Sequence, residues 1–483
     1  MNLSATRTVQ EYIDETPNWP DGTHTAEAPM TSMQWRIWML ATAGKFFEGL
    51  VVFMTGVALP LIVAEFHLDA AQKGMVSAAT LFGILVGASA LGGLADHFGR
   101  KAMFIAEMAL FVAFLMLVTW SSSLLWLLIG LFGLGLALGC DYPTAHLVIS
   151  ESIPSNFRGR LVLAAFGFQA MGALAGTALG YIILRDDKSI ADWRLMYAAA
   201  ILPALLVVIA RFSVPQSSHW LVARNRIPEA EREMVKLLVR RPQYPKEIKL
   251  RHSHDGTAKR PGFLSLFSKR HRRATILASV PWFLQDLSTY GIGIFTPIIL
   301  ASTIGKGLSG PPRDISEILF SDMQAAKGAA FLDVLLLAGM IAAVVMADKV
   351  GRIRLQIVGF VGCAAGLLLA AFSSYCSGSW KMTLIFAGFM IFNLMTNLGP
   401  NAMTYLIAGE VFPTSIRGMG AGFAASFAKI GAVLTAFLFP ILLKDLGTAT
   451  LLYGLVGASL LGAVVTWCFR IETKGVNLET LNY

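Results

Sequence analysis

Twelve long apolar stretches are the feature that most constrains how this chain can fold. Each is close to the length of about 20 residues, or longer, that an α-helix needs to cross the hydrocarbon core of a bilayer. Only 14% of the residues are charged, whereas soluble domains are about one quarter charged. We therefore predict an all-α membrane protein with twelve transmembrane helices, at 36–63, 75–95, 102–120, 124–148, 160–184, 194–214, 274–302, 325–347, 354–375, 382–408, 418–443 and 447–470.

The basic residues indicate which side of the membrane the connections face. Sixteen of the 39 Lys and Arg lie in one stretch, Arg211 to Arg273, between the sixth and seventh apolar stretches. Cytoplasmic loops carry such an excess, so the net charge of +9 needs no nucleic-acid partner. An even number of helices then places both termini in the cytoplasm. The predicted units are a tail at 1–33, a six-helix half at 34–214, a basic loop at 215–272, a second half at 273–470 and a tail at 471–483.

Two motifs occur twice in the chain, six apolar stretches apart. GGLADHFGRKAMF at 92–104 is matched by MADKVGRIRLQ at 346–356, and ESIPSNFRGR at 151–160 is matched by GEVFPTSIRG at 409–418. A duplicated six-helix unit predicts two pseudo-symmetric bundles with a transport site between them. We expect the turns to gate the cytoplasmic side; the alternative is that their charges only set the topology. The expected gating residues are Asp96, Gly99, Arg100, Glu151, Arg158, Asp348, Arg352, Glu410 and Arg417.

Ionisable residues inside the apolar stretches are candidates for a site, because a charge there is costly and rarely faces lipid. Asp286 and Tyr290 are four residues apart and share one face of a helix, and Trp282 lies on that face one turn earlier. Lys429 lies deep in the eleventh stretch and needs a partner. An acid and a lysine at this depth can bind a proton and an anion. The alternative is an ion pair that only locks two helices together.

Five further ionisable residues lie in these stretches away from their ends. Lys45 and Glu48 are three residues apart, close enough to neutralise each other; contact with a solute or a proton is the alternative. Asp141 is either a site residue or one partner of a structural ion pair. Glu107 and Asp333 belong to no motif, and we expect both to be structural.

Several motifs resemble the sugar-porter branch of the major facilitator superfamily: the repeated turns, VPQSSHWLVARNR (214–226) and IETKG (471–475). A narrower likeness to the phosphate:proton symporters lies in GCDYPTAHLVISE (139–151), WFLQDLSTYG (282–291), NLGPNAMTYLIAGEVFPT (397–414) and AKIGA (428–432). Where that family has an Asp pair after its Phe-Phe, this chain has Glu48 followed by Gly49 and Val52. The resemblance implies a site between the halves, built from Asp141, Tyr142, Gln169, Trp282, Asp286, Tyr290 and Lys429.

We interpret the chain as a secondary active transporter that moves a small anionic solute, phosphate-like or an organic acid. Alternating access with proton symport is the expected mechanism. The expected substrate-binding residues are Tyr142, Gln169, Trp282, Tyr290 and Lys429, and the expected proton-coupling residues are Asp286, Asp141 and Glu48.

Two other functions stay open at this point. One is a uniporter or exporter of a neutral or aromatic metabolite or sugar, and the other is a sensor that binds a solute without moving it. The sequence has no Walker A motif, nucleophile motif or His/Cys metal cluster, so we expect no enzyme, cofactor or metal. The expected partners are a small molecule, protons and the lipid bilayer. We expect a monomer in a bacterial inner membrane.

Overall fold

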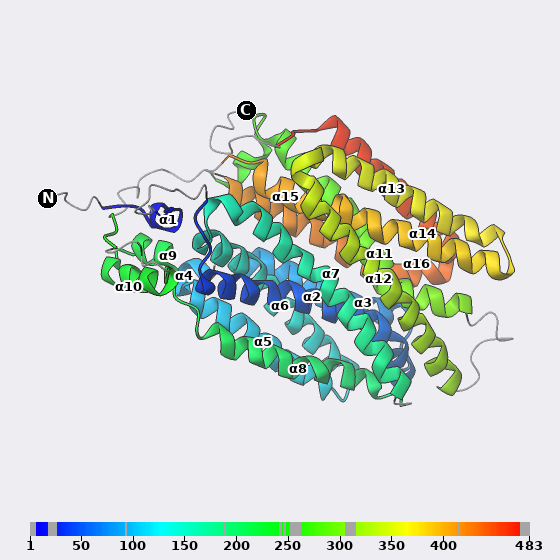
Figure 1. The fold of residues 1–483 in the computed structure, drawn as a ribbon. Coiled ribbons are helices and arrows are strands. Elements are labelled where there is room, and N and C mark those ends of the chain that lie inside the picture. Colours follow the sequence, from blue (N-terminus) through cyan, green and yellow to red (C-terminus); the bar gives the residue numbers. More distant parts are fainter. Residues whose placement is uncertain are drawn as a thin grey trace.

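The computed structural model describes residues 6–17, 27–91, 94–186, 189–240, 244, 248–251, 262–304, 315–413 and 416–473. The predicted tails and the predicted basic loop lie partly outside these residues. Figure 1 shows long helices that run side by side along one direction, with shorter helices gathered at one end. This arrangement follows from the apolar stretches, since each is long enough to span a bilayer.

The first half of the bundle is formed by six long helices. Thr31 caps the first of them, because its hydroxyl accepts from the Gln34 amide at 3.2 Å while the Gln34 side chain accepts from the Thr31 amide at 2.8 Å. The helices are α2 (Ser32–Phe66), α3 (Ala70–Val86) with a π-helical turn at Gly87–Leu91, α5 (Arg100–Thr119), α6 (Leu124–Ser152), α7 (Ser155–Asp186) and α8 (Asp192–Arg211).

The second half repeats this plan. α16 (Arg417–Cys468) is broken at Gly447, whose backbone is not helical, and so contributes two membrane-crossing segments. Eleven apolar helical spans are present among the described residues, and the break in α16 brings the number of crossings to twelve. The prediction of a twelve-helix membrane protein is confirmed. The other helices are α11 (Arg272–Ile304), α12 (Ile315–Val350), α13 (Arg352–Phe372), α14 (Gly378–Leu398) and α15 (Pro400–Glu410), of which α14 and α15 together form one span.

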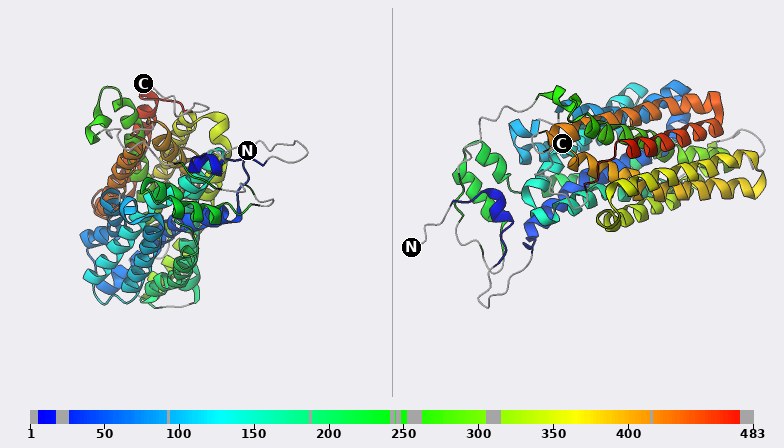
Figure 2. Two further views of the ribbon diagram at one scale, coloured as in Figure 1. Left: turned by 90° about the vertical axis from the view of Figure 1, so that its left-hand side faces the viewer. Right: turned by 90° about the horizontal axis from the view of Figure 1, so that it is seen from above.

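Short helices lie at the end of the bundle that also holds the start of α2 and the end of α16 (Figures 1 and 2). Those near the N-terminus and after α8 pack on the first half through apolar side chains, among them Val9, Tyr12, Trp220 and Met234, whereas Leu266 of the 3-10 turn packs mainly on the second half. The end view in Figure 2 shows the blue-to-cyan helices of the first half beside the orange and red helices of the second. These short elements are α1 (Val9–Ile13), α4 (Leu94–Phe98), α9 (Ser218–Ala223), α10 (Ile227–Leu237) and the 3-10 turn at Phe263–Phe267.

Within the first half, α2 and α7 approach each other so closely that only small residues fit between them. A Cβ atom on Gly172 would overlap the Phe46 carbonyl, and one on Gly176 would overlap the Leu50 carbonyl. A Cβ atom on Gly49 would overlap the Gln169 carbonyl on α7. The chain therefore has no room for an acidic side chain at position 49, where the phosphate-symporter pattern has one.

The two halves contact each other through α2 with α11, α7 with α12 and α3 with α16. At the end opposite the short helices the contact is tight, because a Cβ atom on Gly56 would overlap the Ile294 carbonyl. Nearer the middle, the Ser89 hydroxyl donates to the Ser426 hydroxyl at 2.8 Å. The contact at Gly56 closes the space between the halves at the end opposite the short helices.

Candidate functional site

A cluster of four charged side chains lies between the two halves at the middle of the bundle. Lys429 on α16 is its centre, with Nζ 3.2 Å from Asp286 Oδ2 on α11 and 3.4 Å from Glu48 Oε1 on α2. The same ammonium donates to the Tyr290 hydroxyl at 2.7 Å. Only 7% of Lys429 and 2% of Asp286 is exposed. The acid and the lysine that the sequence singled out are therefore direct partners across two helices.

Glu48 joins the lysines of the two halves. Lys45 Nζ lies 2.5 Å from Glu48 Oε2, so the predicted pairing within α2 is present, but the other oxygen of Glu48 faces Lys429. Glu48 Oε1 also accepts from the Tyr290 hydroxyl at 3.0 Å and from the Gln169 amide at 3.3 Å. Two lysines and two carboxylates cancel in charge when all are ionised. A solute anion or a proton that enters the cluster must therefore displace one of these contacts.

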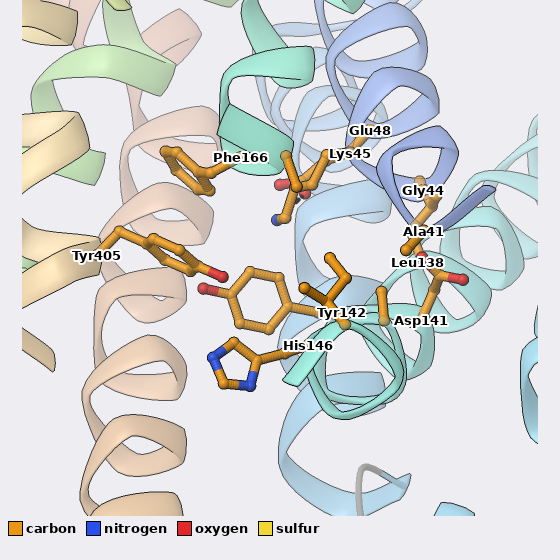
Figure 3. Close-up of a pocket in the computed structure, with 13 residues that line it drawn as sticks. Ala41, Gly44, Lys45, Glu48, Leu138, Asp141, Tyr142, His146, Phe166 and Tyr405 are labelled. Carbon is orange, nitrogen blue, oxygen red and sulfur yellow. Dashed lines mark hydrogen bonds and ion pairs between the residues drawn. The ribbon is translucent and has the colours of Figure 1, made fainter. Parts of the chain in front are cut away.

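Aromatic rings close the cluster on the side of the short helices. The ring of Tyr405 on α15 stacks on Phe166 at 4.5 Å between centroids and meets Tyr142 and Trp282 edge-on at 5.9 and 6.1 Å. Lys45 Nζ lies 3.9 Å from the centre of the Tyr142 ring. Figure 3 shows the hydroxyls of Tyr142 and Tyr405 pointing toward each other below Lys45. Both ends of the central space are therefore closed in this state.

A small cavity runs through this cluster. It includes every predicted substrate-binding residue together with Lys45 and Asp286. Tyr405 was missed by the sequence reasoning, although it lies inside the quoted stretch 397–414, because nothing in the sequence distinguishes this tyrosine from a packing residue. The cavity lining comprises Lys45, Ile84, Ala88, Tyr142, Phe166, Gln169, Trp282, Asp286, Tyr290, Asn401, Ala425 and Lys429.

Asp141 lies beside this cluster but is held by a different partner. Arg211, at the end of α8, donates to Asp141 Oδ1 at 2.6 Å and to the carbonyls of Phe104 and Leu40 at 2.5 and 3.1 Å. Figure 3 shows the Asp141 carboxylate directed away from the Tyr142 ring. Arg211 is fully buried, so its assignment to the basic cytoplasmic stretch was wrong. The charge count included Arg211 although it lies inside the sixth apolar stretch, 194–214, and its pairing with Asp141 favours the structural alternative for that acid.

The Asp141–Arg211 pair predicts a large loss of stability when one partner is removed. We expect Arg211→Met to lower the free energy of unfolding by about 3–5 kcal/mol, because it leaves a buried carboxylate without a counter-charge. The double variant Arg211→Met with Asp141→Asn is the control and should recover most of this loss. Thermal unfolding in detergent measures both. An unchanged midpoint for Arg211→Met would contradict the buried pair.

The first repeated motif forms an ionic network at the end of the short helices. Arg100 Nη1 lies 2.8 Å from Asp96 Oδ1, and Arg100 Nη2 lies 3.0 Å from Glu151 Oε1 at the end of α6. Ser217 donates a short hydrogen bond to the same Glu151 carboxylate. Gly99 before α5 has φ 96°, a conformation that side chains strongly disfavour. The predicted gating residues Asp96, Gly99, Arg100 and Glu151 therefore form one contiguous unit.

The second repeat reproduces this network in the other half. Arg352 lies 2.9 Å from Asp348 Oδ1 and 3.1 Å from Glu410 Oε2. Thr473 donates to Glu410 at 2.5 Å, as Ser217 does to Glu151. Gly351 has φ 100°, close to the value at Gly99. The sequence repeat is therefore also a repeat in side-chain geometry.

Two residues outside the repeated turns cap the helices that follow them. The Gln216 side chain accepts from the Lys101 amide at the start of α5 at 3.1 Å. Glu472 accepts from the Arg352 and Ile353 amides at the start of α13 at 3.0 and 3.2 Å. An acceptor at a helix N-terminus satisfies amides that lack a partner within the helix. The motifs at 214–226 and 471–475 thus have matching roles, with a neutral cap in the first half and a charged cap in the second.

The two remaining predicted gating arginines contact their own halves. Arg158 Nη2 donates to Gln10 Oε1 at 2.9 Å, which ties the start of α7 to α1. Arg417 Nε donates to the Phe412 carbonyl at 3.2 Å.

Next to these networks, burial lowers the pKa of the His219 imidazole on α9, so this side chain is neutral at physiological pH.

Two pseudo-symmetric helical halves around a buried polar cluster define a multi-pass membrane transporter of the major facilitator type. A sequence model of the family described as "Sugar (and other) transporter" matches residues 37–483, and the chain belongs to this family. The fold is shared with the proton:xylose symporter XylE of Escherichia coli, with a TM-score of 0.73 at 22% sequence identity, over 93% of this chain and 98% of that one.

Curated relatives carry different solute names. The putative metabolite transport protein YaaU of Escherichia coli is 28% identical over 93% of this chain and 94% of its own length. A putative inorganic phosphate transporter of Schizosaccharomyces pombe is 26% identical over 94% of this chain and 88% of its own length. The niacin transporter NiaP of Acinetobacter baylyi is 26% identical over 84% of this chain and 86% of its own length. This protein is therefore a transporter of a small molecule, and not an enzyme.

Proposed function

We propose that the protein is a secondary active transporter that carries a small anionic solute in symport with protons, by alternating access of the central cluster to the two sides of the membrane. The observation that carries this proposal is the position of Lys429 between Glu48 and Asp286. A buried ammonium can exchange a protein carboxylate for a solute anion only if the released carboxylate becomes neutral, since a bare charge at this depth is costly. Taking up a proton provides that neutralisation.

Two of the relatives support an anion but do not choose among anions. One is named as a phosphate transporter and another as a niacin transporter. A neutral solute is the second candidate. It is favoured by the aromatic rings of Tyr142, Phe166, Trp282 and Tyr405 at the cavity and by a relative named as the glucose transporter GlcP.

A thermal-shift screen of the purified protein tests the proposal. Inorganic phosphate, benzoate, nicotinate, xylose and glucose are compared at pH 5.5 and 7.5. A ligand present at 100 times its Kd stabilises the folded state by about 2.7 kcal/mol, which gives a clear rise in the unfolding midpoint. We expect a rise with an anion that is larger at the lower pH. Stabilisation by sugars alone would favour the neutral candidate.

We further propose that both termini face the cytoplasm of a bacterial inner membrane and that the transporter is a monomer. The basic stretch after α8 supports the orientation, and one relative is the inner membrane metabolite transport protein YgcS of Escherichia coli. Single cysteines at Ser189 and Asn225, two exposed residues, test the orientation in a background without the native cysteines. A membrane-impermeant maleimide added to intact cells should label position 189 and not position 225. Labelling at 225 alone would reverse the orientation.

The repeated ionic networks are proposed to form the cytoplasmic gate. Asp348 links the halves, because Arg160 Nε of the first half lies 3.6 Å from Asp348 Oδ2. Asp96, its counterpart, pairs with Arg100 in its own half.

The gate predicts unequal effects for these two acids. We expect Asp348→Asn to slow turnover by up to about fivefold, since an exposed ion pair contributes about 0.2–1 kcal/mol, with little change in solute affinity. Asp96→Asn is the matched variant and should have a smaller effect. Solute exchange in proteoliposomes measures turnover, and equal, normal rates in both variants would show that these charges only set the topology.

A further inference from the structure

We propose that Asp333 is a proton-titratable contact between the two halves, so that its protonation favours the packed arrangement of α7 and α12 and its ionisation favours their separation. The inference rests on the proposed proton coupling and assigns a part of it to a residue outside the central cluster. It also revises the expectation that Asp333 has a structural role only. The contact lies on one of the surfaces along which the halves must move relative to each other.

The hydrogen bond at Asp333 joins the two halves directly. Thr177 Oγ1 on α7 lies 2.9 Å from Asp333 Oδ2 on α12. The same hydroxyl lies 3.1 Å from the Ala173 carbonyl oxygen. A threonine hydroxyl has one hydrogen to donate, so it cannot satisfy both acceptors fully. A protonated Asp333 resolves this conflict, because it donates its own hydrogen to Thr177 while Thr177 donates to Ala173.

The surroundings of Asp333 also favour its neutral form in this state. The residue is 4% exposed, and no salt bridge to it is found within the described part of the chain. An ionised carboxylate that is buried without a counter-charge is strongly unfavourable. Loss of the proton therefore favours any arrangement in which the surface between α7 and α12 opens and water reaches the carboxylate.

A small cavity reaches from the central cluster toward this contact. Leu336, one turn after Asp333 on α12, lines it together with Gln169 and Tyr290, both of which hydrogen-bond to Glu48. The cavity has a volume of about 20 Å³, and about 10–15 Å³ is enough for a water molecule. The cavity therefore extends from the central cluster to Leu336, one turn of helix from Asp333.

The other titratable groups near this surface are distinct from Asp333. On α12 itself, Asp322 is 1% exposed, and neither of its carboxylate oxygens has a hydrogen-bond partner among the residues that the structure describes. On α14 the nearest polar group does not titrate: the Asn393 amide donates to the Leu332 carbonyl at 3.1 Å. Titratable groups on the helices packed against α12 include Tyr181 and Asp186 on α7, Lys45, Glu48 and Glu65 on α2, Asp286 and Tyr290 on α11, Cys363 on α13, Lys381 on α14, and Tyr405 and Glu410 on α15.

The pH dependence of the distance between the halves tests the proposal without a solute. Spin labels are placed at Ser189→Cys and Ser379→Cys, exposed residues of the first and second half, in a background without the native cysteines. Distances are measured in lipid nanodiscs between pH 5 and pH 8. We expect the unsubstituted protein to shift toward a second distance as the pH rises. Asp333→Asn should keep the pH 5 distribution throughout, because an amide can donate to Thr177 as the protonated acid does.

Asp322→Asn is the matched control, since it makes the same substitution on the same helix away from Thr177, and it should retain the pH response. A normal response in Asp333→Asn, or an equal loss in Asp322→Asn, would overturn the assignment. Asp286→Asn separates the role of Asp333 from the proposed proton coupling. If the pH response of the distance is lost in Asp286→Asn but kept in Asp333→Asn, proton coupling stands and only the role of Asp333 is removed. No pH response in the unsubstituted protein would overturn the role of Asp333 alone, because Asp286 is expected to take up its proton only when the solute is bound.

Discussion

Replacing Lys429 with alanine is expected to abolish binding of the anion that stabilises the protein in the thermal-shift screen. The ammonium is the cation shared by Glu48, Asp286 and Tyr290, and it is buried, so water cannot replace its charge. Truncating one partner of a buried, hydrogen-bonded charge pair costs about 2–5 kcal/mol. Because about 1.4 kcal/mol corresponds to a tenfold change in affinity, the Kd should rise at least about 30-fold.

The experiment needs controls for folding, because Lys429→Ala also leaves two carboxylates with one lysine. The double variant Lys429→Ala with Asp286→Asn keeps the cluster neutral and should fold while still failing to bind the anion. Lys444→Ala, an exposed lysine on the same helix, should bind normally. Titration calorimetry with the selected anion measures all three. Anion binding retained by a folded Lys429→Ala would favour the neutral solute.

The sequence predicted the fold because it depends on features that are local and repeated. A helix that crosses a bilayer needs only a long apolar stretch, and the duplicated turns around Arg100 and Arg352 indicated the two halves. The pairing of Lys429 with Asp286 was also within reach, since a buried lysine must have a partner and few acids lie at that depth. Its distance of 3.2 Å confirms that these two residues meet.

Other contacts could not be predicted, because they depend on how helices distant in sequence are rotated against one another. Asp141 carries a family motif, yet its carboxylate turns toward Arg211 on α8, a residue that the charge pattern assigned to a loop. Tyr405 closes the aromatic layer, although its neighbours Thr404 and Leu406 give no sign of a site. Both outcomes follow from side-chain packing between helices, which the spacing of residues along one helix does not encode.

Asp286 is the better candidate of the two central acids for the group that takes up the coupled proton. Glu48 is held by Lys45, Lys429, Tyr290 and Gln169, whereas the hydrogen bond found for Asp286 is the one from Lys429. An anion that binds Lys429 weakens the attraction that keeps Asp286 ionised, so Asp286 then favours a proton. Solute and proton thereby bind cooperatively, and linkage requires that each raises the affinity for the other by the same factor.

We therefore expect Asp286→Asn, which mimics the protonated acid, to bind and exchange the solute but to lose accumulation driven by a pH gradient. The solute ratio across a proteoliposome membrane should fall to about one, because a transporter that carries no proton gains nothing from the gradient.

Glu48→Gln is the informative comparison: it removes the charge that also neutralises Lys45, so it should weaken binding as well as coupling. Exchange and pH-driven uptake of the same labelled anion distinguish the two variants. If Asp286→Asn still concentrates the anion while Glu48→Gln does not, the coupled proton is taken up by Glu48, and the contact between Lys429 and Asp286 only positions the lysine.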